Sequence, residues 1–122
     1  MPTQGPLPVS DAAYRTDVLA HRGLLLVEFW KAGCGPCAAF GPVLQQWAAE
    51  HPEIPVRTYE IDLNSPVRFA IWKRLRIAAT PTVILYKDGA AVLRIAGHRP
   101  LEQLRAEIAV AVAGGGMERD IA

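Results

Sequence analysis

Two cysteines, Cys34 and Cys37, are separated by a Gly-Pro dipeptide and lie where a strand-like run gives way to a helix-like run. Before them, residues 24–30 (LLLVEFW) form a short apolar run of the length expected for a buried strand. After them, apolar residues recur at helical spacing, at Phe40, Val43, Leu44, Trp47 and Ala48. The first cysteine is therefore predicted at the start of a helix, with the second one turn into it. A pair in this arrangement can open and close as a disulfide.

The predicted position at a helix start makes Cys34 the expected nucleophile. A thiolate, not a thiol, attacks disulfides, and a helix N-terminus lowers the pKa of a cysteine from about 8.5 into a range of roughly 3.5 to 7.5. Pro36 has no N–H to lose and fixes φ for the first helical turn, while Gly35 adds no side chain beside the sulfur. Cys37 is expected to point back towards Cys34 and to resolve the mixed disulfide.

Two other uses of the cysteine pair fit the sequence less well. A structural zinc site needs four ligands, but His21, His51 and His98 are scattered without paired spacing. A permanent structural disulfide across so short a loop would remove little chain entropy and stabilise the fold weakly. We therefore favour a redox-active pair.

Length and composition limit the remaining possibilities. At 122 residues the chain is long enough for one hydrophobic core, and we expect one domain. Its 51% apolar residues and net charge of +1 lack the basic excess that nucleic-acid binding usually needs. No uncharged apolar stretch approaches the roughly 18 residues that span a bilayer, and the first residues lack the pattern of a secretory signal. We therefore expect a cytoplasmic monomer that binds neither nucleic acid nor a membrane.

Hydrophobic periodicity and turn residues predict alternating strands and helices. Strands are expected at residues 24–30, 56–61, 82–86 and 91–95, with residues 7–9 as a short edge strand. Helices are expected from Ser10 to about residue 20, at residues 34–50, from Asn64 or Ser65 to about residue 75, and from Pro100 to about residue 113. The resulting order, βαβαβαββα, is a three-layer α/β fold with a mixed sheet and helices on both faces. We expect residues 7–113 to form the domain, between flexible segments at residues 1–6 and 114–122.

Several short motifs follow one another in the order and spacing of one known family. They are TDVL at 16–19, VEFW at 27–30, CGPC at 34–37, Pro42, ID at 61–62, TPT at 80–82, KDG at 87–89 and Gly97. On these motifs the chain resembles the thioredoxin family over residues 7–112. The resemblance implies a thioredoxin fold and an enzyme that reduces disulfides in other proteins.

The resemblance also implies a substrate-binding surface around the dithiol. It implies a cis peptide bond before Pro81, lying against the cysteines, and a free backbone at Thr80 that pairs with an extended substrate segment. Trp30 is expected to pack beside the dithiol. The other residues implied at this surface are Gly33, Gly35, Pro36 and Gly97.

Glu28 is the most informative charged residue, because it interrupts an apolar strand that should be buried on both faces. A buried carboxylate is costly and tends to stay protonated, with a raised pKa. Since the family usually has Asp here, the resemblance implies that Glu28 relays a proton to or from Cys37. The alternative is that Glu28 lies at the strand end and reaches solvent.

Three departures from the family pattern bear on function. The family usually has Trp where this chain has Gly33 and Lys where it has Ala38, and both groups surround the substrate. Thr58 replaces a buried lysine, so the usual electrostatic partner of Glu28 is missing. These changes leave room for a second hypothesis, in which the chain is a binding module dedicated to one partner with slow or incidental exchange.

The main hypothesis is a reductant of protein disulfides, rather than an oxidant or isomerase. Cys34 attacks, Cys37 releases the reduced product and Glu28 manages the proton. No bound cofactor is expected, because the electrons reside in the two thiols. The resemblance implies that the flavin-dependent, NADPH-driven thioredoxin reductase reloads the pair.

Overall fold

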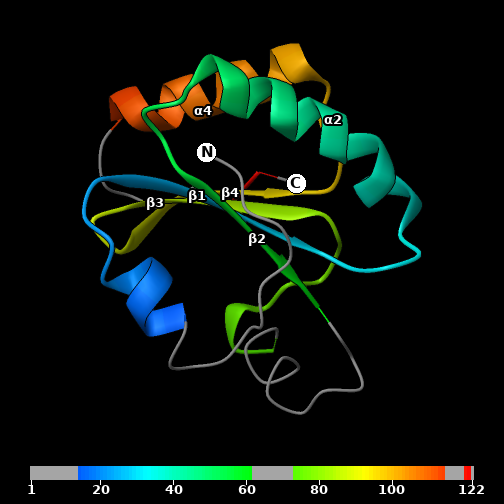
Figure 1. The fold of residues 1–122 in the computed structure, drawn as a ribbon, viewed down its shortest axis with the longest axis horizontal. Helices are drawn as coiled ribbons and strands as arrows, with labels where there is room; N and C mark the ends of the chain where they lie inside the picture. Colours follow the sequence, from blue (N-terminus) through cyan, green and yellow to red (C-terminus); the bar gives the residue numbers. More distant parts are fainter. Residues whose placement is uncertain (1–13, 62–72, 115–119, 122) are drawn as a thin grey trace.

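A five-stranded mixed sheet forms the centre of the computed structural model, which describes residues 14–61, 73–114 and 120–121 (Figure 1). The strand order is β2-β1-β3-β4-β5. The strands are β1 (Leu24–Trp30), β2 (Val56–Glu60), β3 (Thr82–Lys87), β4 (Ala90–Ala96) and β5 (Asp120–Ile121). β1 runs parallel to β2 and antiparallel to β3, so the first strand along the described chain lies inside the sheet.

The β3–β4 hairpin turns where the sequence predicts it. Asp88 and Gly89 both have positive φ, of 53° and 82°, as a tight turn between antiparallel strands requires. Asp88 also fixes this turn to the start of β1, because its Oδ1 accepts from the backbone N–H of Gly23 at 2.7 Å.

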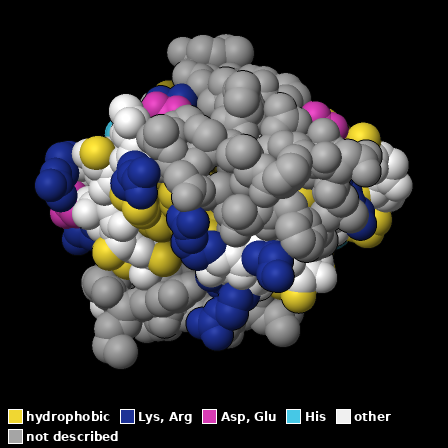
Figure 2. Space-filling view, turned by 90° about the horizontal axis from the view of Figure 1, so that it is seen from below, with side chains coloured by type: hydrophobic (Ala, Val, Ile, Leu, Met, Phe, Trp, Pro, Cys, Tyr) yellow, Lys and Arg dark blue, Asp and Glu magenta, His cyan; other side chains and the backbone are white. Residues whose placement is uncertain are grey.

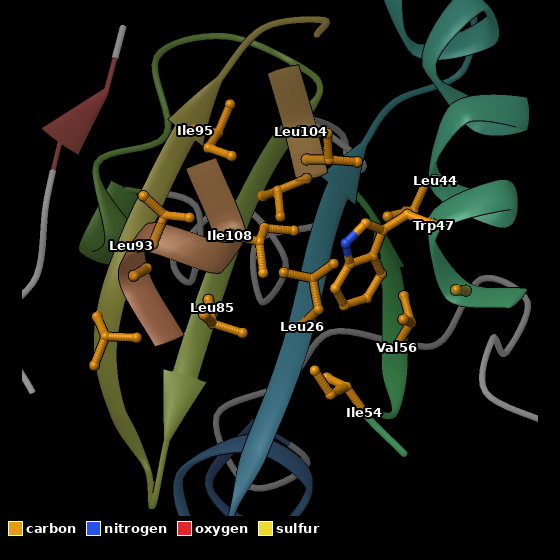
Figure 3. Close-up of a cluster of buried hydrophobic side chains, with 14 of the residues drawn as sticks. Leu26, Leu44, Trp47, Ile54, Val56, Leu85, Leu93, Ile95, Leu104 and Ile108 are labelled. Atoms are coloured by element: carbon orange, nitrogen blue, oxygen red, sulfur yellow. The ribbon is translucent and has the colours of Figure 1, made fainter. Parts of the chain in front are cut away.

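Helices α2 (Gly35–Glu50) and α4 (Leu101–Gly114) cover one face of the sheet (Figure 1). Trp47 of α2 inserts between the helices and the sheet, beside Leu26 of β1 (Figure 3). Aliphatic residues of β3, β4 and α4 complete this core, including Leu85, Leu93 and Leu104. Alternating residues of the strands supply this face, as the period of a β-strand requires.

The opposite face carries a second, aromatic core. The rings of Tyr14, Phe29 and Tyr59 lie 5.8 to 6.3 Å apart, and the hydroxyls of Tyr14 and Tyr86 are hydrogen-bonded. The short π-helix η1 (Arg15–Leu19) lies on this side (Figure 1). The predicted arrangement, a mixed sheet with helices on both faces, is therefore confirmed.

Several basic side chains lie on the described part of one face of the molecule (Figure 2). Figure 2 shows the molecule from below, where several Lys and Arg side chains lie on the described part of the surface and acidic side chains lie near its edges. Exposed Lys73, Arg74 and Arg76 belong to the segment on this side of the sheet. Among the described residues, no helix is long and apolar enough to cross a membrane.

The element bounds differ from the predicted ones in a few places. Of the helix predicted at residues 10–20, the structure describes the part that contains η1. Of the helix predicted to start at Asn64 or Ser65, it describes the last residues, 73–75, which are helical. β5 pairs in parallel with β4 at Arg94 and Ile95, and the sequence does not predict it. Ser10, the edge strand at 7–9 and the segment 1–6 lie outside the described residues, so the domain limits stay predictions.

Candidate active site

Cys34 lies at the start of α2, as the sequence predicts. It is the N-cap residue, with an extended backbone (φ −92°, ψ 110°), and Pro36 occupies the first turn. The backbone N–H of Cys37 donates to Cys34 Sγ at 3.2 Å, so the sulfur satisfies a helix N–H that would otherwise lack a partner. A negative charge on this sulfur is favoured by the same N–H and by the helix dipole.

The two cysteines are joined as a disulfide but differ in accessibility. Cys34 is half-buried, whereas only 8% of Cys37 is exposed. An incoming sulfur can therefore reach Cys34 more readily than Cys37. This asymmetry suits a pair in which one cysteine attacks and the other resolves.

The loop before β3 packs against the sulfur of Cys34. The Thr80–Pro81 peptide bond is cis, as the resemblance implies. Thr80 Oγ1 donates to Cys34 Sγ at 3.4 Å, and the carbonyl oxygen of Thr80 lies 3.4 Å from the same sulfur. The end of β4 joins them, because the backbone N–H of Gly97 donates to the carbonyl of Pro81 at 2.7 Å. Thr80, Pro81 and Gly97 are thus brought together with the disulfide.

The side chain of Thr80 has a role that the sequence does not predict. We expected only its backbone to take part, but its hydroxyl contacts the sulfur directly. A hydroxyl donor beside a sulfur favours the thiolate over the thiol. The signal was present in the sequence as a hydroxyl residue directly before the active-site proline.

The remaining predicted surface residues lie around the disulfide along the chain. Gly33, Gly35 and Pro36 are exposed, and Trp30 is half-buried at the end of β1. Gly33 has φ of 76°, a conformation that glycine adopts without strain. Ala38, in the first turn of α2, is exposed as well. Contact of these residues with a substrate stays a prediction.

Glu28 is buried inside the sheet, with 6% of its surface exposed. In the register of the sheet it lies between Thr58 of β2 and Val83 of β3. It follows Leu26 by two residues, so both side chains lie on the face that α2 and α4 cover. The alternative of a solvated strand-end residue is therefore wrong.

Burial raises the pKa of Glu28 from 4.5 to about 7. Thr58 beside it is also buried and brings no positive charge to offset this effect. At neutral pH the carboxyl group can therefore both accept and donate a proton. Elsewhere in the described part of the chain, no group of three or more His, Cys, Asp or Glu is placed to hold a metal ion.

Comparisons with known proteins agree with this geometry. The family model for thioredoxin matches residues 5–110. A thioredoxin from Mycolicibacterium smegmatis is 36% identical over 104 residues, which are 85% of this chain and 92% of that protein. A "bifunctional thioredoxin reductase/thioredoxin" from Mycobacterium leprae is 33% identical over 94 residues, which are 76% of this chain and 20% of that protein.

Among solved structures, thioredoxin f2 from Chlamydomonas reinhardtii superposes with a TM-score of 0.73 at 22% identity. The match covers 85% of this chain and 94% of that one, and it confirms the thioredoxin fold. With the cysteine pair seated at the start of α2 and a family match over most of its length, the chain belongs to the thioredoxin family and is a thiol–disulfide oxidoreductase.

Proposed function

We propose that this oxidoreductase reduces disulfide bonds in other proteins, with Cys34 as the nucleophile. The observation that carries the proposal is the half-buried Cys34 sulfur, which caps α2 while Cys37 lies behind it. The Cys34 thiolate attacks one sulfur of the substrate disulfide and expels the other as a thiolate. Cys37 then attacks Cys34, which releases the second substrate thiol and forms the Cys34–Cys37 disulfide. Two electrons pass from the chain to the substrate.

Glu28 serves as the proton acceptor in the second step. Cys37 must lose its proton before it can attack, and it is shielded from solvent. The carboxyl group of Glu28 lies on the sheet face beneath α2, and its pKa of about 7 leaves much of it ionised at neutral pH. It accepts the proton and returns it when the pair is reduced again.

The substrate binds as an extended segment across the loop before β3. The half-buried Thr80 offers its backbone to such a segment, while the hydrogen bond from the Gly97 N–H to the Pro81 carbonyl holds the loop in place beside it. The rest of the proposed substrate surface consists of residues on either side of the first cysteine: Trp30, Gly33, Gly35 and Pro36. Since Gly33 and Ala38 are small and exposed, bulky substrates meet little obstruction there.

A thioredoxin reductase is the proposed electron donor. Support comes from the Mycobacterium leprae relative, whose name joins a reductase and a thioredoxin in one protein. We further propose that the chain works as a monomer in the cytoplasm, where reductants keep such a pair cycling.

Insulin reduction driven by NADPH and a thioredoxin reductase tests the proposal. We expect the wild-type chain to sustain NADPH oxidation, whereas Cys34→Ser gives only the background rate. Absence of turnover by a wild-type chain that the reductase does reduce would contradict it. The binding-module hypothesis instead expects one partner to co-purify stoichiometrically, and equally well with Cys34→Ser.

A further inference from the structure

Arg99 is a buried arginine in the connection between β4 and α4. Only 8% of it is exposed, although both of its chain neighbours, His98 and Pro100, are exposed. In Figure 1 this connection lies at the same end of the molecule as the start of α2. A buried guanidinium is costly unless hydrogen bonds and an opposite charge compensate it. Arg99 has both kinds of contact.

The guanidinium of Arg99 holds two carbonyl groups of its own connection. Its Nη1 donates to the carbonyl of Ala96 at 3.2 Å and to that of His98 at 3.2 Å. These carbonyls belong to the Ala96–Gly97 and His98–Arg99 peptide groups, so a single nitrogen holds the backbone at both ends of the Gly97–His98 dipeptide. A Cβ atom added to Gly97 would lie 3.9 Å from Nη1 of Arg99, so the guanidinium packs against this glycine.

An acidic residue of α4 fixes the guanidinium in turn. Arg99 Nε lies 3.5 Å from Glu107 Oε1, and both side chains are largely buried, with exposed fractions of 10% and 15%. The second carboxylate oxygen of Glu107 accepts from Gln103 at 2.9 Å. The buried charge of Arg99 is thus paired with an opposite charge on α4.

A continuous series of contacts joins Arg99 to the reactive sulfur. Arg99 holds the Ala96–Gly97 and His98–Arg99 peptide groups, and the N–H of Gly97 donates to the carbonyl of Pro81 at 2.7 Å. The preceding residue, Thr80, contacts Cys34 Sγ. The next residue, His98, has an exposed ring that meets Phe40 of α2 edge-on, with centroids 5.9 Å apart.

We propose that Arg99 is a positioning residue for protein substrates: it fixes Gly97 and His98 as one wall of the surface on which the substrate segment lies. The inference rests on the proposed function, because it needs an extended substrate beside Thr80 and Pro81. Arg99 does not touch the sulfurs through any of these contacts. Its loss should therefore weaken binding of a protein substrate and leave the intrinsic reactivity of the dithiol unchanged.

Two variants of Arg99 separate its charge from its shape. Arg99→Lys keeps the charge but loses the planar guanidinium, whose Nη1 donates to two carbonyls while its Nε faces Glu107. Arg99→Met removes both. The matched control is Arg105→Met, which breaks the other Arg–Glu pair of α4, the one with Glu50 of α2, at the opposite end of α2 from the disulfide.

The experiment measures insulin reduction over a range of insulin concentrations, with NADPH and thioredoxin reductase in fixed excess. We expect Arg99→Met to raise KM for insulin about tenfold, as the loss of one ordered hydrogen-bonding group implies, and Arg99→Lys to raise it by somewhat less. We expect kcat, and the rate at which the pre-reduced chain reacts with the small disulfide DTNB, to stay within about twofold of wild type. Arg105→Met should leave all three quantities unchanged.

Each other outcome has one meaning. An unchanged KM for insulin in both Arg99 variants would overturn the role of Arg99. A fall in the rate of the DTNB reaction as large as the rise in KM would also overturn it. An equal rise of KM in Arg105→Met would show a general effect of loosening α4 and would also overturn it. If Arg99→Met does not fold, the KM of Arg99→Lys for insulin provides the test. A wild-type chain that reacts with DTNB but not with insulin would instead refute the proposed function, and this inference with it.

Discussion

The two ends of α2 differ in the surroundings of their charged and reactive groups. At the N-terminal end, Cys34 is half-buried and the carboxyl group of Glu28 is enclosed in the sheet below. At the C-terminal end, Arg105 of α4 donates to Glu50 through Nε at 2.8 Å and also through Nη2. There the ring of His51 stacks on Trp47, with centroids 4.6 Å apart.

The difference is clearest in the two glutamates. Burial raises the pKa of Glu28 to about 7, whereas the hydrogen bond from Arg105 is the main reason that the pKa of Glu50 is lowered to about 2. One end of the helix thus keeps an acid that can exchange protons at neutral pH, and the other keeps an acid that is fully ionised there. We infer that the N-terminal end is arranged for chemistry at a cost in stability, while the C-terminal end fixes the helix.

The largest expected effect concerns the cysteines at the N-terminal end. Cys34→Ser should abolish exchange, because the remaining thiol, Cys37, is shielded from substrates, whereas Cys37→Ser should trap substrates covalently through Cys34. Non-reducing gels with a protein disulfide substrate measure the trapping. After reduction of the wild-type chain, iodoacetamide at neutral pH should label Cys34 faster than Cys37. Faster labelling of Cys37 would reverse the roles.

At the C-terminal end, the largest expected effect is on stability. Trp47 is 1% exposed and fills the core between α2 and the sheet (Figure 3). Trp47→Ala should cost about 3–5 kcal/mol of unfolding free energy, through lost burial and the cavity that remains. Trp47→Phe is the matched control and should cost less. Urea unfolding measures both, and a loss below about 1 kcal/mol for Trp47→Ala would show that the core is not organised around this ring.

Glu28, at the N-terminal end, should make the folded chain less stable as the pH rises. Its pKa is higher in the folded chain than the 4.5 of the free side chain, so the folded state favours the protonated form. The stability of the wild-type chain is then full below pH 4.5 and falls as the pH rises through about 7. A shift of this size corresponds to about 3 kcal/mol above neutral pH. Glu28→Gln should therefore be more stable than wild type at pH 8 and nearly equal to it at pH 4.5.

The same substitution should slow the release of product more than the first attack. Cys34 attacks as a thiolate that the helix start already favours, whereas Cys37 must give its proton to an acceptor in the core. Stopped-flow kinetics with a slow-release substrate separates the two steps. If Glu28→Gln changes neither the second step nor the pH dependence of stability, Glu28 has no part in the mechanism.

Local signals made much of this site predictable. An apolar run, two cysteines and a proline at the next helix start predict the place of the disulfide, and Lys87-Asp88-Gly89 predicts the hairpin. The burial of Glu28 follows from its place inside an apolar strand. In each case the residues that determine the structure are neighbours in the sequence.

Contacts between distant segments could not be predicted in this way. Thr80 meets Cys34 across 46 residues of chain, and β5 pairs with β4 although α4 separates them in the sequence. Arg99 stands between a histidine and a proline in a polar stretch, where an arginine ordinarily faces solvent. Its buried charge is paired with Glu107 of α4, a contact that no local pattern indicates.

The smallest expected effect concerns the ion pair between Glu50 and Arg105. In the folded chain the pKa of Glu50 is about 2, below the 4.5 of the free side chain. Glu50 therefore contributes stability above pH 4.5, and this contribution is lost as the pH falls towards 2. Because both groups are solvent-accessible, water and salt screen the pair and its contribution is small.

Arg105→Met should therefore lower Tm slightly at pH 7, and the difference from wild type should shrink between pH 4.5 and about pH 3, as Glu50 begins to protonate in the unfolded chain. It should also shrink in about 1 M NaCl, where the Debye length is about 3 Å. Arg15→Met, an exposed arginine of η1 on the other side of the sheet, is the matched control and should show neither dependence. A Tm difference that is constant with pH and salt would mean that Arg105 acts through the packing of its stem, and that the C-terminal end of α2 is fixed by Trp47 and its neighbours rather than by charge.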